Sequence, residues 1–273
     1  QVDLLSKQLH SFGIGRGDRV TIVLPNGVEH IVSFLAVTAA GATAVPLNPA
    51  FTKEELRFCL EDANAKAFIS SPAESEAVKA ALKDSIISIA IGTDGDGWVC
   101  FTSSKNEIEP RHVGPSYAGD VALVLHTSGT TSRPKRVPLT HRNLLVSAQN
   151  IVETYALTAD DVSLCVMPLF HIHGLVASTL ATLISGGVVV VPTKFNALDF
   201  WQTVEAHHVT WYSAVPTMHQ ALLNRAKRST GSQAIEISSR NLRFIRSCSA
   251  PFIPEVLIDM EETFNIPVLE AYG

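Results

Sequence analysis

The sequence predicts an α/β protein in which mostly parallel sheets are flanked by helices. Short apolar runs rich in valine and isoleucine alternate with segments of helical periodicity along most of the 273 residues. Such alternation is typical of βαβ units, whose strands lie parallel and whose helices cover the faces of the sheet. Ligands of open parallel sheets bind beyond the carboxyl ends of the strands. We therefore expect the functional residues in loops that follow strands.

The first half of the sequence contains repeated strand and helix signals. Thr52 and Glu55 form a capping-box pattern, and the helical period after it runs to about Asp62. Another helix is expected over residues 28–40, ending at Gly41. The polar stretch 102–117 is the candidate linker, so we predict a first α/β subdomain at residues 1–115 and a second at residues 116–273. The expected strands are residues 19–24, 42–45, 65–70 and 121–125.

The second half continues the alternation. Residues 162–166, 242–247 and 267–270 are expected strands, and residues 255–264 are an expected helix. Four apolar side chains recur at the spacing i, i+3, i+4, i+7, which places them on one face of a helix and predicts that they belong to the core. These residues are Ala197, Phe200, Trp201 and Val204.

The uncharged span 162–193 has the length of a membrane-spanning helix. Residues that end helices and strands interrupt it, including Pro168, Gly174, the Gly186-Gly187 pair and Pro192. We therefore interpret the span as strand, turn, helix and strand, and expect no transmembrane segment.

Composition excludes several classes of protein. Hydrophobic residues make up 46% of the chain and charged residues 17%, which excludes an intrinsically disordered protein. A net charge of −5 disfavours a nucleic-acid-binding surface. Three arginines, Arg240, Arg243 and Arg246, come close together, and we expect them to flank a strand.

The cysteines bear on the compartment. Cys59, Cys100, Cys165 and Cys248 are far apart in the sequence, which favours reduced thiols over a disulfide framework and hence a reducing compartment. The sequence begins within a helical period, without the pattern of a signal peptide. We expect an intracellular protein of the cytosol or the peroxisome, two compartments that this sequence does not separate.

The stretch 126–136, His-Thr-Ser-Gly-Thr-Thr-Ser-Arg-Pro-Lys-Arg, follows an apolar run and precedes a helix that we expect to begin near His141 with Thr140 as its N-cap. Backbone N–H groups, hydroxyls and a lysine can converge there on one polyphosphate. The residues concerned are Thr127, Ser128, Gly129, Thr130, Thr131 and Lys135. Because Pro134 precedes the lysine and Arg136 follows it, the P-loop pattern of nucleoside triphosphatases is not met. A hydroxyl-rich turn without a phosphate remains the alternative.

A second motif, residues 167–174 with the sequence Met-Pro-Leu-Phe-His-Ile-His-Gly, follows the expected strand 162–166. His171 and His173 therefore lie at the carboxyl end of a strand. A His-x-His pair can ligate zinc but needs a third ligand, and neither Cys165 nor the pair His207-His208 has the spacing of one. A structural turn and a ligand-facing role are the other two interpretations.

These motifs together resemble the adenylate-forming superfamily, the acyl-CoA synthetases and other AMP-binding enzymes. Its signature T-S-G-[ST]-T-G-x-P-K-G matches residues 127–136, except that Ser132 and Arg136 replace glycines. Its P-L-F-H motif matches residues 168–171. Further matches are residues 17–20, 24–26, 46–49, 214–217, 247–252 and 270–273, so the resemblance spans essentially the whole chain. Ser132 and residues 246–250 are most similar to the oxalate–CoA ligase and 4-coumarate–CoA ligase-like branch.

The resemblance implies ATP, Mg²⁺ and CoA as cofactors and assigns roles to residues. Lys135 and the loop hydroxyls would hold the β- and γ-phosphates, His171 would border the acyl carboxylate and the nucleotide, and His173 would line the acyl pocket. Lys194 would lie near a CoA phosphate, with a solvated lysine as the alternative. The adenine site would consist of Ser249, Ala250, Pro251, Glu270, Ala271, Tyr272 and Gly273.

The implied reaction begins with attack of a carboxylate on the α-phosphate of ATP, which gives an acyl-adenylate and pyrophosphate. CoA then displaces AMP. We expect Lys135 and His171 to be the catalytic residues and a small dicarboxylate such as oxalate to be the substrate, because a buried negative group needs a partner such as His173. Coumarate-type and fatty acids are the alternatives. Alternatives of other classes are a non-catalytic nucleotide-binding module and a Walker-type NTPase.

The same resemblance leads us to expect that the chain is an internal piece of the large N-terminal domain of the fold. The family motif at Gly273 continues with a threonine and a Mg²⁺-holding glutamate, and a small C-terminal domain carries the catalytic lysine. We therefore assign no metal ligand to this chain and expect activity of the full-length protein, not of these residues alone.

Overall fold

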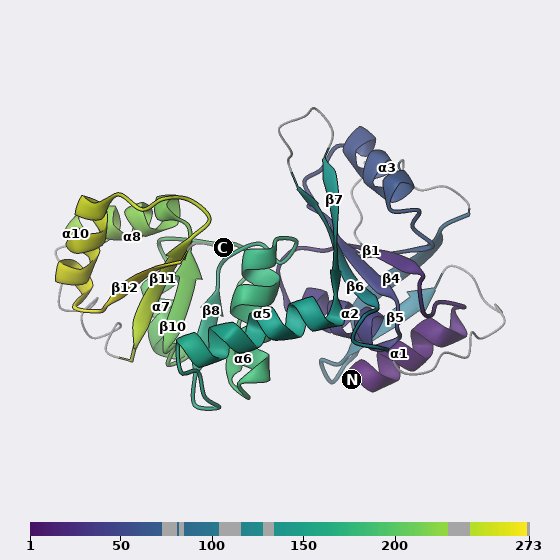
Figure 1. The fold of residues 1–273 in the computed structure, drawn as a ribbon, viewed down its shortest axis with the longest axis horizontal. Coiled ribbons are helices and arrows are strands. Elements are labelled where there is room, and N and C mark those ends of the chain that lie inside the picture. Colours follow the sequence, from purple (N-terminus) through teal and green to yellow (C-terminus); the bar gives the residue numbers. More distant parts are fainter. Residues whose placement is uncertain (73–80, 82–84, 104–115, 128–133, 229–240, 272–273) are drawn as a thin grey trace. The chain divides into compact units, whose positions relative to one another are not determined.

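The computed structural model describes residues 1–72, 81, 85–103, 116–127, 134–228 and 241–271 (Figure 1). Contacts group the chain into two compact units. The first unit is Gln1–Val146 with Leu169–His171, and the second is Ser147–Pro168 with Ile172–Gly273. Each unit contains one sheet. The predicted α/β class with mostly parallel sheets and flanking helices is confirmed.

The sheet of the first unit has the strand order β5-β4-β3-β1-β2-β6-β7 in the described residues. Its inner pairs are parallel, whereas β5 and β7 each lie antiparallel to their neighbour. The strands are β1 (Arg19–Val23), β2 (Thr43–Pro46), β3 (Ala67–Ser70), β4 (Ile87–Thr93), β5 (Val99–Ser103), β6 (Val121–Thr127) and β7 (Lys135–Thr140). The helices are α1 (Val2–Ser11), α2 (Val28–Ala39), α3 (Lys53–Asp62) and α5 (His141–Thr154), the last of which continues into the second unit.

The predicted capping box opens α3. The Thr52 amide donates to Glu55 Oε2 at 2.7 Å, and the Glu55 amide donates to Thr52 Oγ1 at 3.3 Å. The apolar face of α3 packs through Leu56 and Leu60 into a core that includes Phe68 of β3. This local signal therefore fixes both the start of the helix and its orientation on the sheet.

Three strands of the first unit were missing from the prediction: β4, β5 and β7. The sequence indicated that the stretch after residue 127 leads to a helix, but residues Lys135–Thr140 form β7, antiparallel to β6. Residues 128–133 thus connect the two strands of a hairpin and lie outside the described residues. The predicted N-cap is confirmed, since the Asn143 amide donates to Thr140 Oγ1 at 3.2 Å and α5 begins at His141.

The second unit has a sheet of order β12-β11-β10-β8-β9 in the described residues, and all of its pairs are parallel. Its strands are β8 (Val162–Cys165), β9 (Val188–Val190), β10 (Trp211–Ala214), β11 (Phe244–Cys248) and β12 (Val268–Ala271). Its helical elements are the π-helix η1 (His173–Leu180), α6 (Ala181–Ile184), α7 (Phe200–Ala206), α8 (Pro216–Arg228) and α10 (Pro254–Phe264). Five strands in one direction bring five carboxyl ends to the same edge.

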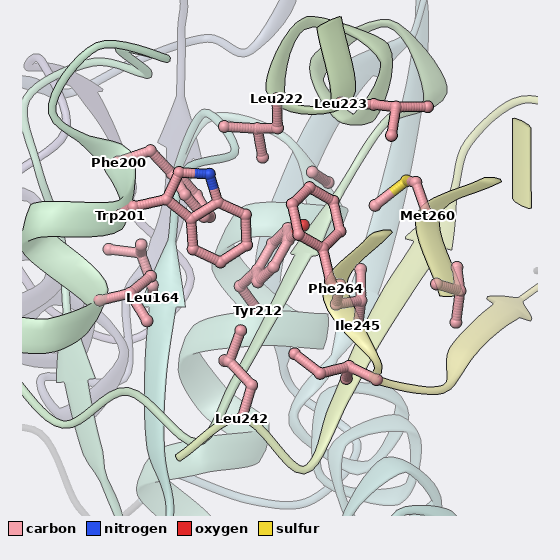
Figure 2. Close-up of a cluster of buried hydrophobic side chains, with 14 of the residues drawn as sticks. Leu164, Phe200, Trp201, Tyr212, Leu222, Leu223, Leu242, Ile245, Met260 and Phe264 are labelled. Atoms are coloured by element: carbon pink, nitrogen blue, oxygen red, sulfur yellow. The ribbon is translucent and has the colours of Figure 1, made fainter. Parts of the chain in front are cut away.

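A large cluster of buried apolar side chains in the second unit joins α7, α8 and α10 to the strands of this sheet (Figure 2). Phe200 and Trp201 of α7 pack edge to face at 5.2 Å, and Trp201 contacts the Phe264 ring at 4.7 Å. The apolar stripe predicted at Ala197, Phe200, Trp201 and Val204 is therefore core, although α7 begins only at Phe200. Burial of these large side chains is the main stabilising contribution to the unit.

Other expectations have mixed outcomes. Arg246 does not flank a strand but lies within β11 and is only 8% exposed, so that expectation was wrong. The span 162–193 contains β8, η1, α6 and β9, as predicted, and none of the described helices is long and apolar enough to cross a membrane. β6 follows residue 115 yet pairs with β2, which precedes it, and the division into subdomains 1–115 and 116–273 stays a prediction.

Two buried histidines make stability depend on pH. Burial lowers the pKa of His30 and of His219 from 6.5 to about 4. The unfolded chain therefore binds protons between pH 6.5 and 4 where the folded chain does not, so stability falls as pH falls through this window. Between pH 7 and pH 5 we expect a loss of roughly 2 kcal/mol per histidine.

Urea unfolding at pH 7 and at pH 5 measures this loss. Because carboxylates also contribute to acid sensitivity, the variant His30→Gln isolates the histidine, and its unfolding free energy should depend less on pH by about 2 kcal/mol. If the unfolding free energies of wild type and variant depend on pH in the same way, folding does not lower the pKa of His30.

Candidate active site

The candidate site in the second unit lies at the carboxyl edge of its parallel sheet. His173 follows β8, Lys194 follows β9, and Ser249 follows β11. Glu270 and Ala271 end β12. The parallel pairing of neighbouring strands places all of these residues at one edge, where ligands of such sheets bind.

His173 is held by hydroxyl groups on both sides of its ring. Its Nε2 lies 2.6 Å from Ser213 Oγ on β10, and its Nδ1 lies 3.0 Å from Ser249 Oγ. The side chain is 4% exposed, and the Cys248 sulfur lies 3.2 Å from Nδ1. His173 also begins the π-helix η1, an uncommon turn that occurs mostly at functional sites. The ring is therefore fixed in position between two strand ends.

Ser249 has an unusual backbone. Its φ is +75°, a conformation that costs a non-glycine residue about 1–3 kcal/mol and is found mainly at functional sites. The residue is exposed, as are Ala250 and Pro251. The strain turns the chain at the end of β11 so that the Ser249 hydroxyl contacts His173.

The two segments predicted to frame adenine are adjacent. β11 and β12 pair so that Ser247 lies opposite Glu270 and Cys248 opposite Ala271. The Phe252 amide donates to Glu270 Oε1 at 2.8 Å, which links the turn after β11 to β12. Tyr272 and Gly273, the other predicted members, lie outside the described residues.

Lys194 borders a separate cavity of about 220 Å³ in the same unit. Val166 and Phe200 form apolar parts of its wall, and Asn196 and Asp199 form polar parts. The lysine is exposed. This placement agrees with either a CoA contact or a solvated lysine, and the role of Lys194 stays a prediction.

In the first unit the hydroxyl-rich loop begins and ends on paired residues. Thr127 and Lys135 lie opposite each other, and the Thr127 hydroxyl donates to the Lys135 carbonyl at 3.4 Å. Both residues are exposed. Ser128, Gly129, Thr130 and Thr131 lie outside the described residues. The hairpin therefore fixes Lys135 at the point where the loop ends.

His171 is close to this loop end. It lines a cavity of about 540 Å³ together with Phe170, His126 and Pro134, the residue before Lys135. The Asn26 side chain accepts the Leu169 amide at 2.9 Å and anchors the segment that carries His171. Burial of part of the ring lowers the pKa of His171, so the imidazole is neutral at pH 7. A neutral ring can donate to a carboxylate without forming an ion pair.

Arg136, which replaces a glycine of the family signature, fixes the second strand of the hairpin to α3. Its Nη1 donates to the Asp62 carbonyl at 2.5 Å, and Asp62 Oδ2 lies 3.1 Å from Nε2 of the buried His126. Register pairs His126 with Arg136 across the two strands. Both side chains therefore tie the base of the loop to the carboxyl end of α3.

Sequence reasoning missed three residues around His173. Ser213 contacts His173, Arg246 donates to Ser213 Oγ at 3.0 Å, and the Tyr155 hydroxyl accepts from Arg246 Nε at 3.1 Å. One signal was present, because Arg246 is a charged residue inside the run 242–247 predicted to be a strand. Ser213 and Tyr155 carry no such signal.

The described residues contain no group of three or more His, Cys, Asp or Glu side chains arranged to hold a metal ion. They therefore do not form a protein-held Mg²⁺ site, and we assign no chemical step to that ion.

Comparison with known proteins decides the family. The profile of the AMP-binding enzyme family matches residues 1–273. The chain belongs to the AMP-binding enzyme family. The predicted membership is thereby confirmed, and AMP-binding enzymes that are CoA ligases use a carboxylic acid, ATP and CoA.

Relatives within the family include CoA ligases. The chain is 42% identical to an oxalate–CoA ligase of Arabidopsis thaliana over 98% of its own length and 52% of the relative. It is 37% identical to an oxalate–CoA ligase of Saccharomyces cerevisiae over 94% of its length and 51% of that protein. The chain thus spans about half the length of the curated relatives it matches.

Solved structures agree with the fold. The ATP-bound structure of MatB from Rhodopseudomonas palustris superposes with a TM-score of 0.82 at 27% identity, covering the whole chain and 52% of that protein. A Bacillus subtilis o-succinylbenzoate CoA synthetase in complex with its acyl-adenylate gives a TM-score of 0.76 at 25% identity, covering the whole chain and 52% of that protein.

Proposed function

We propose that the protein containing this chain activates a small dicarboxylate, oxalate foremost, as an acyl-adenylate and transfers the acyl group to CoA. One carboxylate oxygen of the acid attacks the α-phosphorus of ATP, and the bond to pyrophosphate breaks. The CoA thiol then attacks the acyl carbon, loses its proton and releases AMP. Both steps bring anions together, so catalysis depends on positioning and on compensating charge.

In this proposal the first unit supplies the charge. Lys135 and the hydroxyls of the loop that it ends hold the β- and γ-phosphates, and Mg²⁺ enters with ATP. His171, neutral and close to the loop end, donates a hydrogen bond to the reacting carboxylate. The turn after β11 and the end of β12 hold the adenine.

The observation that carries the choice of substrate is the polar surrounding of His173. A ring that is 4% exposed and lies between two serine hydroxyls offers hydrogen bonds where a pocket for an alkyl or phenyl chain would be apolar. The two relatives named oxalate–CoA ligases support the same choice. Coumarate-type and fatty acids, the other candidates, would place an apolar chain beside these polar groups and form no hydrogen bond with them.

ATP–pyrophosphate exchange by the full-length protein tests the proposal. With CoA omitted, exchange should depend on the added acid and be fastest with oxalate, slower with malonate, and slowest with coumarate and octanoate. Equal or faster exchange with coumarate or octanoate would refute the dicarboxylate. Hydrolysis of ATP to ADP without any acid would favour a Walker-type NTPase, and ATP binding without exchange would favour a nucleotide-binding module.

A further inference from the structure

Arg246 is a buried cation whose side-chain partners among the described residues are all uncharged. Within the described parts of the chain its polar partners are the hydroxyls of Tyr155 and Ser213 and the thiol of Cys248. No carboxylate in those parts forms an ion pair with it. A guanidinium keeps its proton at any physiological pH, so the positive charge remains in the protein interior.

Arg243, three residues earlier, does pair with a carboxylate, although its side chain is 41% exposed. Its Nη1 lies 2.6 Å from the carboxylate of Asp161, a side chain that is 2% exposed. Burial of a cation without such a partner costs free energy, which a bound anion would recover. Because Arg246 is buried and pairs with no carboxylate among the described residues, we take its partner to be a ligand.

The hydrogen bonds of Arg246 lead to the exposed Ser249. Ser213 Oγ accepts from Arg246 Nη1, so its single hydrogen is available for His173 Nε2 at 2.6 Å. With Nε2 as acceptor, the ring carries its proton on Nδ1 and donates it to Ser249 Oγ at 3.0 Å. The Ser249 hydroxyl then donates its own hydrogen either to Cys248 Sγ, 3.5 Å away, or to a ligand.

We propose that Arg246 is the positioning residue that makes the site select acids with a second negative group. This inference rests on the proposed function and names the residue behind its substrate class. Arg246 supplies the compensating charge and, through Ser213 and His173, orients the hydroxyl of Ser249 toward the second carboxylate. A monocarboxylate has no second negative charge for Arg246 to compensate.

The test compares full-length wild type with Arg246→Met, which keeps an unbranched side chain and removes its charge. Oxalate and glycolate are matched two-carbon acids that differ in the second carboxylate. In ATP–pyrophosphate exchange, Arg246→Met should raise the KM for oxalate roughly 30-fold or more, with a smaller change in kcat, whereas kcat/KM for glycolate should change less than about 3-fold. Malonate and sulfoacetate show whether the second group must be a carboxylate.

Arg246→Lys is the conservative variant. Lysine keeps the positive charge, but its single ammonium group cannot contact Tyr155 and Ser213 at the two positions that the guanidinium nitrogens occupy. The variant should therefore still prefer oxalate, with a raised KM for oxalate. If Arg246→Met does not fold, the KM of Arg246→Lys for oxalate still tests the proposal. The KM for ATP should remain unchanged in both variants.

Two failures can be told apart. If wild type shows no exchange with any dicarboxylate, the proposed function is wrong. If wild type prefers oxalate but either variant loses oxalate and glycolate activity in equal proportion, Arg246 is only structural and the inference fails alone.

Discussion

Replacing Lys135 by alanine in the full-length protein should lower the rate of acyl-adenylate formation by roughly 10²–10³-fold, the usual effect of removing one group that stabilises developing charge. The lysine is the first residue of β7 and is exposed. Its pairing with Thr127 is made by the backbone, so the hairpin should keep its structure in the variant. The KM for the acid should change far less than kcat.

Lys7→Ala is the matched control for this variant. Lys7 is an exposed lysine of α1, outside the candidate site, and its loss should leave the exchange rate unchanged. Pyrophosphate release measured over a range of acid concentrations separates kcat from KM. Equal losses in adenylation rate and in acid binding would mean that Lys135 has only a structural role.

The second large effect is expected at Gly174, which follows His173 in η1. A Cβ at this position would lie 2.4 Å from the Pro168 carbonyl oxygen and 2.7 Å from that of Met167. Both are backbone atoms, which cannot move aside as a flexible side chain can. Gly174→Ala should therefore destabilise the second unit by about 1–3 kcal/mol or more and displace the neighbouring His173.

Thermal unfolding and exchange activity measure the two consequences. For a chain of this size each kcal/mol lowers Tm by roughly 2–4 °C. Gly119→Ala is the control, because a Cβ there would meet no atom within 4 Å. If Gly174→Ala unfolds at the same temperature as Gly119→Ala and retains wild-type activity, the close contact does not determine the position of His173.

Signals that are local in the sequence were predictable. Thr52 and Glu55 are three residues apart and form their capping box within one turn, and Thr140 caps α5 in the same way. Strands β8, β11 and β12 of the second unit were predictable because each is a short run between turn residues, whereas β10 was not predicted. From their direction alone His173, Ser249 and Glu270 could be placed at one edge.

Features that depend on distant partners were not predictable. β7 contains Lys135, Arg136 and Pro138 and is largely exposed, so its sequence lacks the apolar pattern of a strand and its structure depends on pairing with β6. Arg246 and Tyr155 are separated by 91 positions, and Ser213 reaches His173 across 40. The family signature placed the site, whereas the buried hydrogen-bond chain around His173 required the structure.

Oxalate-dependent ATP–pyrophosphate exchange by the full-length protein, with CoA omitted, tests the central claim most directly. Exchange requires that the acid and ATP form a mixed anhydride reversibly, so it detects the acyl-adenylate step itself. The account predicts rapid exchange that needs oxalate and falls steeply in Lys135→Ala. Exchange that proceeds equally without oxalate, or does not occur with it, would contradict the account.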